Sequence, residues 1–143
     1  MQDHYRALEQ LFFKAQINSF FPGTISVGEK EATLTLEVEE KYFHTLGSLH
    51  GAVYFKLLDD ATAYAALSLS DIHPYVTASF TIDYFAPVTA GMITATGRVV
   101  RQEGKKVYVE GILTDDQNVE VAKGTGLFLP AKMTFADIPY YKK

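Results

Sequence analysis

One uninterrupted stretch, residues 51–69, constrains the fold more than any other part of the sequence. It is rich in the helix-forming residues Ala and Leu and has no internal Pro or Gly, so we expect one long helix. Its apolar residues occupy almost every angle around the helix axis, whereas a surface helix has a single apolar stripe. Such a helix must be buried on most sides, and the rest of the chain therefore has to wrap around it.

The segments on either side of this helix have the pattern of strands. Segments 75–87, 92–103, 106–115 and 119–129 alternate apolar and polar residues and are joined by short turns, and we interpret them as a consecutive meander. Two further strands, 24–28 and 32–38, precede the long helix, and helical spacing predicts a short amphipathic helix over 3–16. This order predicts an α+β fold in which a curved antiparallel sheet wraps around a central helix.

The length of 143 residues, without an internal repeat or linker, predicts a single domain with its core at about 24–129. The tail, 130–143, has no sustained period, and we expect a surface segment that is partly disordered. The N-terminus lacks the cationic start and clean apolar block of a signal peptide, and no segment has the roughly 20 apolar residues that span a bilayer. We therefore expect a cytoplasmic protein without a membrane partner.

The composition narrows the chemistry that is available. The absence of cysteine excludes disulfides, thiolate metal sites and thiol nucleophiles. The net charge of −4 gives no reason to expect nucleic acid as a partner. The four histidines, His4, His44, His50 and His73, show no zinc-ligand spacing, so we expect no metal and no cofactor. The reactive groups must come from Asp, Glu, His, Ser, Thr, Tyr or the backbone.

Two neighbouring acids interrupt the long apolar helix. Lys56 and Asp60 are four residues apart, so they can pair on a solvated strip of the helix. Asp59 lies about 100° further round, on a strip with Ala52 and Phe55 whose apolar members indicate burial. A buried carboxylate is costly unless it is hydrogen-bonded or functional. Asp59 is therefore a candidate catalytic acid, and the alternative is that Lys56 or a hydroxyl simply satisfies it.

Gly51 opens the helix directly after His50. The first turn of a helix has unpaired N–H groups and a positive dipole end, and it can bind an oxyanion. The missing side chain lets a substrate carbonyl approach the N–H group of Gly51. Eight residues of helix separate the backbones of Gly51 and Asp59 by roughly 12 Å, so one carbonyl cannot contact both within one chain. We expect a homodimer in which neighbouring antiparallel helices combine the two residues and the open sheet edge is covered.

Three sequence segments resemble a known family. They are Leu49-His50-Gly51-Ala52, then after five residues Leu58-Asp59-Asp60-Ala61, and the strand end Asp83-Tyr84-Phe85-Ala86-Pro87. Together they resemble the hotdog-fold acyl-CoA thioesterases of the phenylacetate-degradation and 4-hydroxybenzoyl-CoA type, over about residues 24–129. The resemblance implies a hotdog fold, hydrolysis of an acyl-CoA to a carboxylate and CoA, and a homodimer that pairs into a dimer of dimers.

The resemblance also implies roles for individual residues. The N–H of Gly51 would polarise the thioester carbonyl, and Asp59 would activate water as a general base or attack the thioester itself. Thr77 matches a Ser or Thr that positions water, although a plain surface threonine is an equal alternative. Two positions depart from the family pattern: His44 stands where Asn is common, and Ala52 stands where the family usually has Gly.

The same resemblance suggests where an acyl-CoA would bind. Beside His50 and Ala52, the acyl group would lie between the helix and the partner subunit, near apolar residues. A basic cluster near a predicted hairpin could bind the phosphates of CoA, and its alternative interpretation is a solvated turn. The apolar residues are Tyr54, Leu58 and Phe80, and the basic cluster comprises Arg98, Arg101, Lys105 and Lys106.

Two other functions compete with hydrolysis. A hotdog enoyl-CoA hydratase or dehydratase would use His44 or His50 together with Asp59 on the carbons next to the thioester. A non-catalytic acyl-CoA-binding module is suggested by His44 and Ala52, which depart from the catalytic pattern. Released thiol distinguishes hydrolysis from both.

Overall fold

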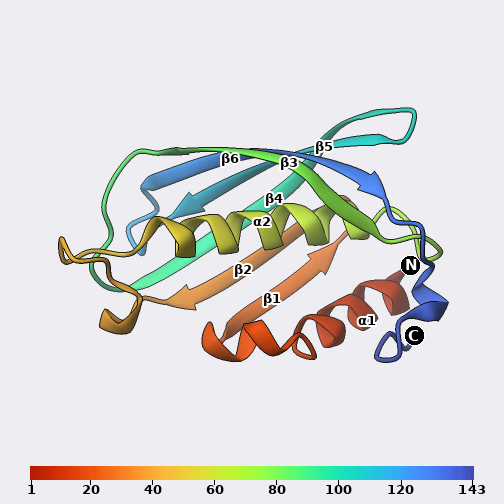
Figure 1. Ribbon diagram of the computed structural model, residues 1–143, viewed down its shortest axis with the longest axis horizontal. Helices are drawn as coiled ribbons and strands as arrows, with labels where there is room; N and C mark the ends of the chain where they lie inside the picture. Colours follow the sequence, from red (N-terminus) through yellow and green to blue (C-terminus); the bar gives the residue numbers. More distant parts are fainter.

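The computed structural model describes residues 1–143. In chain order its elements are α1 (Gln2–Phe12), the 3-10 helix η1 (Gln16–Phe20), β1 (Gly23–Gly28), β2 (Glu31–Glu37), η2 (Glu40–Tyr42), α2 (Gly51–Leu67), β3 (Tyr75–Tyr84), β4 (Met92–Glu103), β5 (Lys106–Thr114), β6 (Glu120–Pro130) and η3 (Phe135–Asp137). A six-stranded antiparallel sheet curves around α2 (Figure 1). The predicted hotdog arrangement, with a long central helix inside a curved sheet, is confirmed.

The strand order differs from the predicted meander. The order across the sheet is β1-β2-β4-β5-β6-β3, so β3 pairs with β6 at one edge and β4 pairs with β2. The link between β3 and β4 crosses the start of α2, where the Leu49 N–H donates to Val88 O and the Tyr54 hydroxyl donates to Ala86 O. Sequential strands usually pair, but here this seven-residue link carries the chain from the edge strand β3 to β4, which lies between β2 and β5.

Two glycines let α2 lie close to the sheet. A Cβ at Gly97 of β4 would lie 2.3 Å from the carbonyl oxygen of Ala61, and one at Gly111 of β5 would lie 2.9 Å from Cγ2 of Thr62. Leu58 and Ala61, on this side of the helix, have no exposed surface. The side of the helix that carries Leu58 and Ala61 is therefore buried against the concave face of the sheet.

The N-terminal segment and the C-terminal tail pack together at one end of the molecule (Figure 1). The helix predicted over 3–16 ends at Phe12 and is followed by η1. The expectation of a partly disordered tail is wrong. Phe135 is 1% exposed, and the hydroxyl of Tyr141 lies 2.7 Å from Nδ1 of His4. Anchoring by such isolated aromatic residues produces no periodic pattern in the sequence. No helix of the chain combines the length and the apolar character needed to cross a bilayer.

Candidate functional site

One face of α2 is not covered by the sheet. We define the α2 strip as Ala52, Phe55, Asp59 and Ala63, which follow one another along this face. Ala52 is exposed, the Phe55 side chain is 38% exposed, and Asp59 and Ala63 are half-buried. The predicted burial of this strip is wrong within a single chain. The strip is instead a partly apolar surface that runs beside β3.

Asp59 is held by a hydroxyl group from β3. The Oγ1 atom of Thr77 donates a hydrogen bond of 2.9 Å to Oδ1 of Asp59, and no other group of the chain donates to this carboxylate. The pairing of β3 with β6 is irregular between Thr77 and Ser79, as expected at a β-bulge. Such an irregularity changes the direction in which a side chain points. The structure therefore brings together Asp59 and Thr77, two of the predicted catalytic residues.

The neighbouring acid, Asp60, has a different environment. Its Oδ2 forms the predicted ion pair with Nζ of Lys56, and this ammonium also donates to Oδ1 of Asn18 at 2.6 Å. The pair lies under η1 instead of on a solvated strip, with side-chain exposures of 15% for Lys56 and 21% for Asp60. Burial raises the pKa of Asp60, and the Lys56 ammonium opposes this rise. Lys56, paired with Asp60, thus fastens η1 to α2.

The start of α2 has one free backbone donor. Nδ1 of His50 accepts the N–H of Ala52 at 2.9 Å, and the carbonyl of His50 accepts the N–H of Val53 at 2.9 Å. The N–H of Gly51 makes no hydrogen bond within the chain. Because it belongs to the first turn of a helix, this donor lies in a region of positive potential. The structure thus leaves the predicted oxyanion donor available.

Tyr84, which the sequence analysis did not select, lies against Gly51. Its hydroxyl donates to the carbonyl oxygen of Gly51 at 3.1 Å, and a Cβ at position 51 would lie 3.2 Å from the same hydroxyl oxygen. The end of β3 is therefore attached to the start of α2. The sequence signal was present, because Tyr84 belongs to the segment Asp83–Pro87 that supports the family resemblance, but nothing in that segment indicates its partner.

His44 is engaged within its own loop. The N–H of Leu46 donates to Nδ1 of His44 at 3.0 Å, so Nδ1 carries no proton. The proton of the neutral ring is then on Nε2, which lies 3.0 Å from Oγ of Ser48 and donates to it. The hydrogen of the Ser48 hydroxyl is left free to donate elsewhere. Ser48 was missed because a lone serine in a loop carries no pattern.

Two of the three apolar residues predicted to contact the acyl group are in the core. Leu58 has no exposed surface, and Tyr54 is 3% exposed with its hydroxyl bound to Ala86 O. A substrate on the surface of the chain therefore cannot contact Leu58 or Tyr54, and this part of the prediction is wrong. Phe80 is half-buried and packs edge-on against Phe55, with 5.1 Å between ring centroids. Only Phe80 reaches the α2 strip.

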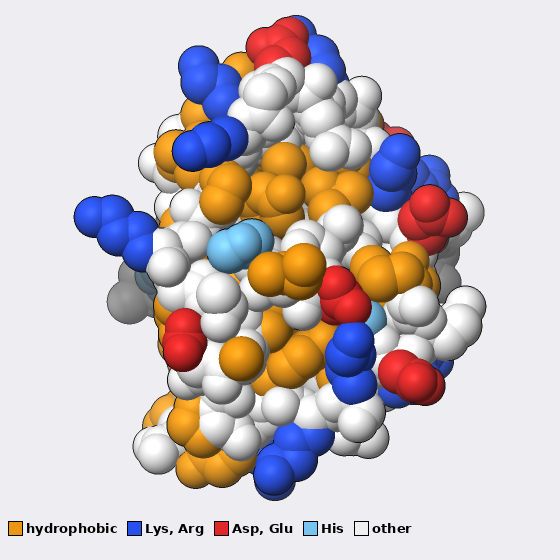
Figure 2. Space-filling model, turned by 90° about the vertical axis from the view of Figure 1, so that its right-hand side faces the viewer, with side chains coloured by type: hydrophobic (Ala, Val, Ile, Leu, Met, Phe, Trp, Pro, Cys, Tyr) orange, Lys and Arg blue, Asp and Glu red, His pale blue; other side chains and the backbone are white.

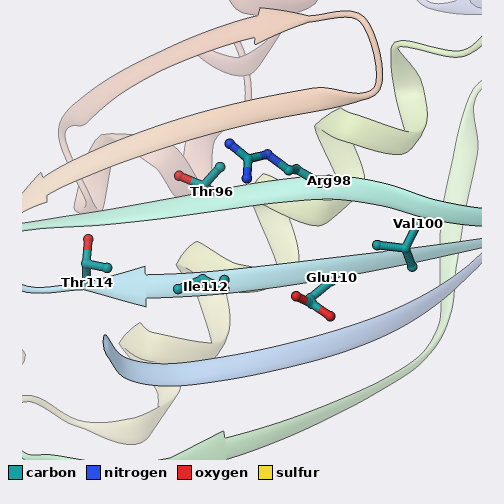
Figure 3. Close-up of a pocket in the computed structure, with 6 residues that line it drawn as sticks. All are labelled: Thr96, Arg98, Val100, Glu110, Ile112 and Thr114. Carbon is teal, nitrogen blue, oxygen red and sulfur yellow. The ribbon is translucent and has the colours of Figure 1, made fainter. Parts of the chain in front are cut away.

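The predicted basic cluster is not brought to this site within one chain. Gly97 faces α2, so the next residue, Arg98, points to the outer face of the sheet. Figure 3 shows Arg98 beside a shallow hollow on β4 and β5, with Glu110 on the neighbouring strand. Arg98 pairs with Glu31 at 3.1 Å. The sheet therefore separates Arg98 from Asp59.

The remaining basic residues lie at the β4–β5 hairpin. Arg101 stacks on the ring of Tyr108 at 4.0 Å and pairs with Glu103, while Lys105 and Lys106 are exposed at the turn. This hairpin lies at the end of the molecule opposite the start of α2 (Figure 1). Figure 2 shows that Lys and Arg side chains at this end are dispersed around apolar surface. Within one chain, these basic residues therefore belong to a solvated turn, the alternative to a phosphate-binding cluster.

Comparisons with known proteins agree with this architecture. The sequence model of the thioesterase superfamily matches residues 46–122, which include Gly51, Asp59 and Thr77. One candidate esterase of Saccharolobus solfataricus is 29% identical over 128 residues, covering 88% of this chain and 91% of the relative. A second candidate esterase from the same organism is 33% identical over 102 residues, covering 71% of this chain and 67% of the relative.

Solved structures of similar fold include two informative relatives. The PaaI protein of E. coli, from the phenylacetic acid degradation operon, superimposes with a TM-score of 0.85 at 25% identity over 93% of this chain and 96% of PaaI. A Streptococcus mutans protein bound to acetyl CoA has a TM-score of 0.73 at 24% identity over 82% of this chain and 94% of its own. The family match spans more than half of the sequence. This chain therefore belongs to the thioesterase superfamily.

Proposed function

We propose that the protein is an acyl-CoA thioesterase, which hydrolyses the thioester bond to a carboxylate and free CoA. One observation carries this proposal: a single helix, α2, has an unpaired N–H donor at Gly51 and a hydrogen-bonded carboxylate at Asp59. These are the two groups that hydrolysis of a thioester requires, a donor for the oxyanion and a base or nucleophile. In this proposal the protein acts without a cofactor. We assign it to the cytoplasm, because a chain without cysteine fits a reducing compartment.

The role of Gly51 follows from its position. When water or a carboxylate attacks the thioester carbon, negative charge develops on the carbonyl oxygen. The N–H of Gly51 donates to this oxygen, and the positive end of the α2 dipole adds to the stabilisation. A fixed backbone donor needs no reorganisation during the reaction. Tyr84, bound to the carbonyl oxygen of Gly51, helps to keep this first turn in place.

Asp59 supplies the second group. As a general base, its carboxylate removes a proton from water, the resulting hydroxide attacks the thioester carbon, and the C–S bond breaks with release of the CoA thiolate. As a nucleophile, it attacks the thioester carbon, the C–S bond breaks with release of the CoA thiolate, and water then hydrolyses the mixed anhydride to the free acid and the Asp59 carboxylate. Thr77 orients the carboxylate by binding Oδ1, which leaves Oδ2 for water or substrate. The proposal includes both routes.

A second copy of the chain completes this site. Gly51 and Asp59 are roughly 12 Å apart along one helix, so we pair Gly51 of one subunit with Asp59 of the partner subunit. The α2 strip with its exposed Phe55 and the edge strand β3 with its exposed Val76 support a homodimer through this surface. Two such dimers can associate into a tetramer.

The choice of an acyl-CoA rests on relatives. A Streptococcus mutans protein of the same fold has been solved with acetyl CoA bound, and the PaaI protein belongs to a phenylacetic acid degradation operon. Within one chain the basic hairpin is far from Gly51. In a dimer with antiparallel α2 helices, however, the hairpin of one subunit approaches the start of the partner's helix. CoA phosphates would then meet Arg101, Lys105 and Lys106 from the other subunit.

The geometry favours hydrolysis over hydration of an enoyl-CoA. A hydratase needs an imidazole that exchanges protons with the substrate. Both ring nitrogens of His44 are hydrogen-bonded within its loop, which removes this imidazole from proton exchange. His50 uses Nδ1 to cap α2, so only its Nε2 is free. Asp59, whose Oδ2 is free, supplies the acid–base group for hydrolysis.

The test is release of CoA thiol from a panel of acyl-CoAs by the purified protein, followed with a thiol reagent. We expect thiol and carboxylate in equal amounts and no hydration of an enoyl-CoA. Asp59→Asn should abolish release, whereas Asp60→Asn, which alters the adjacent acid under η1, should retain it. Thiol release that is unchanged in Asp59→Asn, or absent with every acyl-CoA, would contradict the proposal.

A further inference from the structure

Two adjoining cavities lie beside the start of α2, next to η1 and η2. One, of about 380 Å³, is lined by Phe20 and Ser19, and the other, of about 270 Å³, by His50 and Ala52. Phe21, Lys41 and Tyr42 line both, so the two cavities are neighbours that share these three side chains. We define the aromatic groove by its three rings, Phe20, Phe21 and Tyr42. A cleft of this combined size accommodates a substantial part of a small ligand.

The walls of the aromatic groove are fixed by hydrogen bonds. The Tyr42 hydroxyl donates to Phe20 O at 3.0 Å, which joins η2 to η1. The buried amide of Asn18 donates to Phe12 O at 2.6 Å and accepts from Lys56 at 2.6 Å, which joins η1 to α1 and α2. The groove therefore exists before a ligand arrives, and binding there does not require these segments to become ordered.

The aromatic groove ends beside the two residues that flank the free donor of α2. His50 and Ala52, which line its second cavity, are the residues immediately before and after Gly51. A ligand whose carbonyl oxygen binds the N–H of Gly51 can therefore extend into the groove. An acetyl group is too small to reach Phe20 in the first cavity, whereas a longer acyl group passes from one cavity into the next.

The chemistry of the aromatic groove favours a neutral, apolar group. Phe20 is 66% exposed, so covering its ring removes apolar surface from water. The only charged lining residue is Lys41, whose ammonium is 3.7 Å from the carboxylate of Glu39 and lies over the Tyr42 ring. Because Glu39 already balances this charge, the groove offers no free partner for an anionic group.

We infer that the aromatic groove binds the apolar acyl part of the substrate and selects acyl groups longer than acetyl. This inference rests on the proposed function, since it concerns the same thioester that Gly51 binds. It replaces the predicted acyl site around Tyr54 and Leu58, which are buried in the core. The specificity-determining residue is Phe20, because its ring is exposed and lies in the cavity more distant from Gly51.

A kinetic comparison tests the groove. The measured quantity is the ratio of kcat/KM for decanoyl-CoA to kcat/KM for acetyl-CoA. Phe20→Ala should lower this ratio about tenfold, because the acyl chain loses an apolar contact surface. Phe13→Ala is the matched control: Phe13 is 59% exposed on the same segment but does not line the groove, and its ratio should equal that of the wild type. An unchanged ratio in Phe20→Ala, or an equal fall in Phe13→Ala, would overturn the inference.

A binding measurement separates this inference from the proposed function. The chain has no tryptophan, so Phe20→Trp places a single tryptophan in the groove, and its emission can be excited apart from that of the nine tyrosines. In this variant, decanoyl-CoA should shift the emission to shorter wavelength, and acetyl-CoA should not. If the wild type releases no thiol but the shift occurs, the proposed hydrolysis fails and the groove stands. If thiol is released but decanoyl-CoA produces no shift, the groove is wrong and the hydrolysis stands.

Discussion

Thr77 on β3 and Asp59 on α2 are joined by a hydrogen bond of 2.9 Å between Oγ1 and Oδ1, although 18 residues separate them in the sequence. The bond links the edge strand of the sheet to the exposed face of the central helix. It fixes the plane of the carboxylate and occupies one of its two oxygens. The other oxygen accepts no hydrogen bond within the chain, and in the proposed reaction Thr77 would be a positioning residue for Asp59.

Two replacements of Thr77 distinguish the effect of its hydroxyl on kcat from the effect of its side-chain shape. Thr77→Val keeps the branched side chain but removes the donor, and we expect kcat for thiol release to fall about tenfold, the effect of losing a hydrogen bond to a charged group. Thr77→Ser keeps the donor and should stay within about twofold of the wild type. Steady-state kinetics with a saturating acyl-CoA measure both. Equal kcat values for the Val and Ser variants would show that the hydroxyl does not position Asp59.

The backbone donor of Gly51 can be removed by proline. Gly51 is the first residue of α2, a position that favours proline, and His50 has ψ of 138°, which suits the residue before a proline. Both Gly51→Pro and Gly51→Ala add a Cβ next to Tyr84, but only proline lacks the N–H. We therefore expect kcat of Gly51→Pro to be about 10²-fold below that of Gly51→Ala, the effect of losing one oxyanion donor.

Circular dichroism and melting curves of both Gly51 variants provide the control for folding. If the two variants fold alike and have the same kcat, the Gly51 N–H does not bind the oxyanion.

A shared site makes a quantitative prediction for mixed subunits. Gly51→Pro and Asp59→Asn should each retain at most about 1% of the wild-type activity alone. In a mixed dimer, one site combines both altered residues and the other combines an intact Gly51 with an intact Asp59, so random mixing should restore about a quarter of the wild-type activity. The measurement is thiol release after the two variants are unfolded together and refolded. If each chain contained a complete site, mixing would restore nothing.

The sequence was sufficient to predict the elements that depend on local pattern. The burial of α2 and the strands over 92–103 and 106–115 follow from residue periodicity, and the structure confirms them within about a residue. The position of β3 was not predictable in this way, because a period-two segment shows that a strand exists and does not show which strand it pairs with. The partner of β3 depends on the link that crosses the start of α2.

The candidate site shows the same division between local and tertiary information. The helix positions of Gly51 and Asp59 could be located by counting residues, and the pairing of Lys56 with Asp60 followed from their spacing. The direction of each side chain required the fold. Leu58 and Asp59 are adjacent, yet Leu58 faces the sheet through Gly111 while Asp59 faces outward, because helix and sheet approach each other on one side only. Contacts across elements, such as Tyr84 with Gly51, could not be obtained from the pattern.

The loop before α2 contains a testable hydrogen-bond chain. His44 receives the Leu46 N–H and donates to Ser48, so the Ser48 hydroxyl is oriented with its own hydrogen free. We expect His44→Leu and Ser48→Ala each to lower kcat severalfold. His44→Leu removes the group that orients the Ser48 hydroxyl, and Ser48→Ala removes the hydroxyl itself. The double variant should be no slower than either single variant, since groups that act as one chain are not additive. Additive losses in this cycle would show that His44 and Ser48 act separately.

His4 should make the stability of the protein depend on pH. Its ring has no exposed surface, and it joins α1 to Leu67 O at 2.9 Å and to the tail through Tyr141 at 2.7 Å. Burial lowers the pKa of His4 below its usual 6.5, with Lys143 and the N-terminal ammonium acting in the same direction and Asp71 opposing them. The unfolded chain therefore binds a proton at a higher pH than the folded chain does. The stabilisation is complete above pH 6.5 and is lost as the pH falls from 6.5 through the lowered value.

The test for His4 compares melting temperatures at pH 7.5 and at pH 5. The drop in melting temperature between the two pH values should be smaller in His4→Gln than in the wild type, because glutamine cannot titrate. An equal drop in both proteins would show that His4 does not cause it.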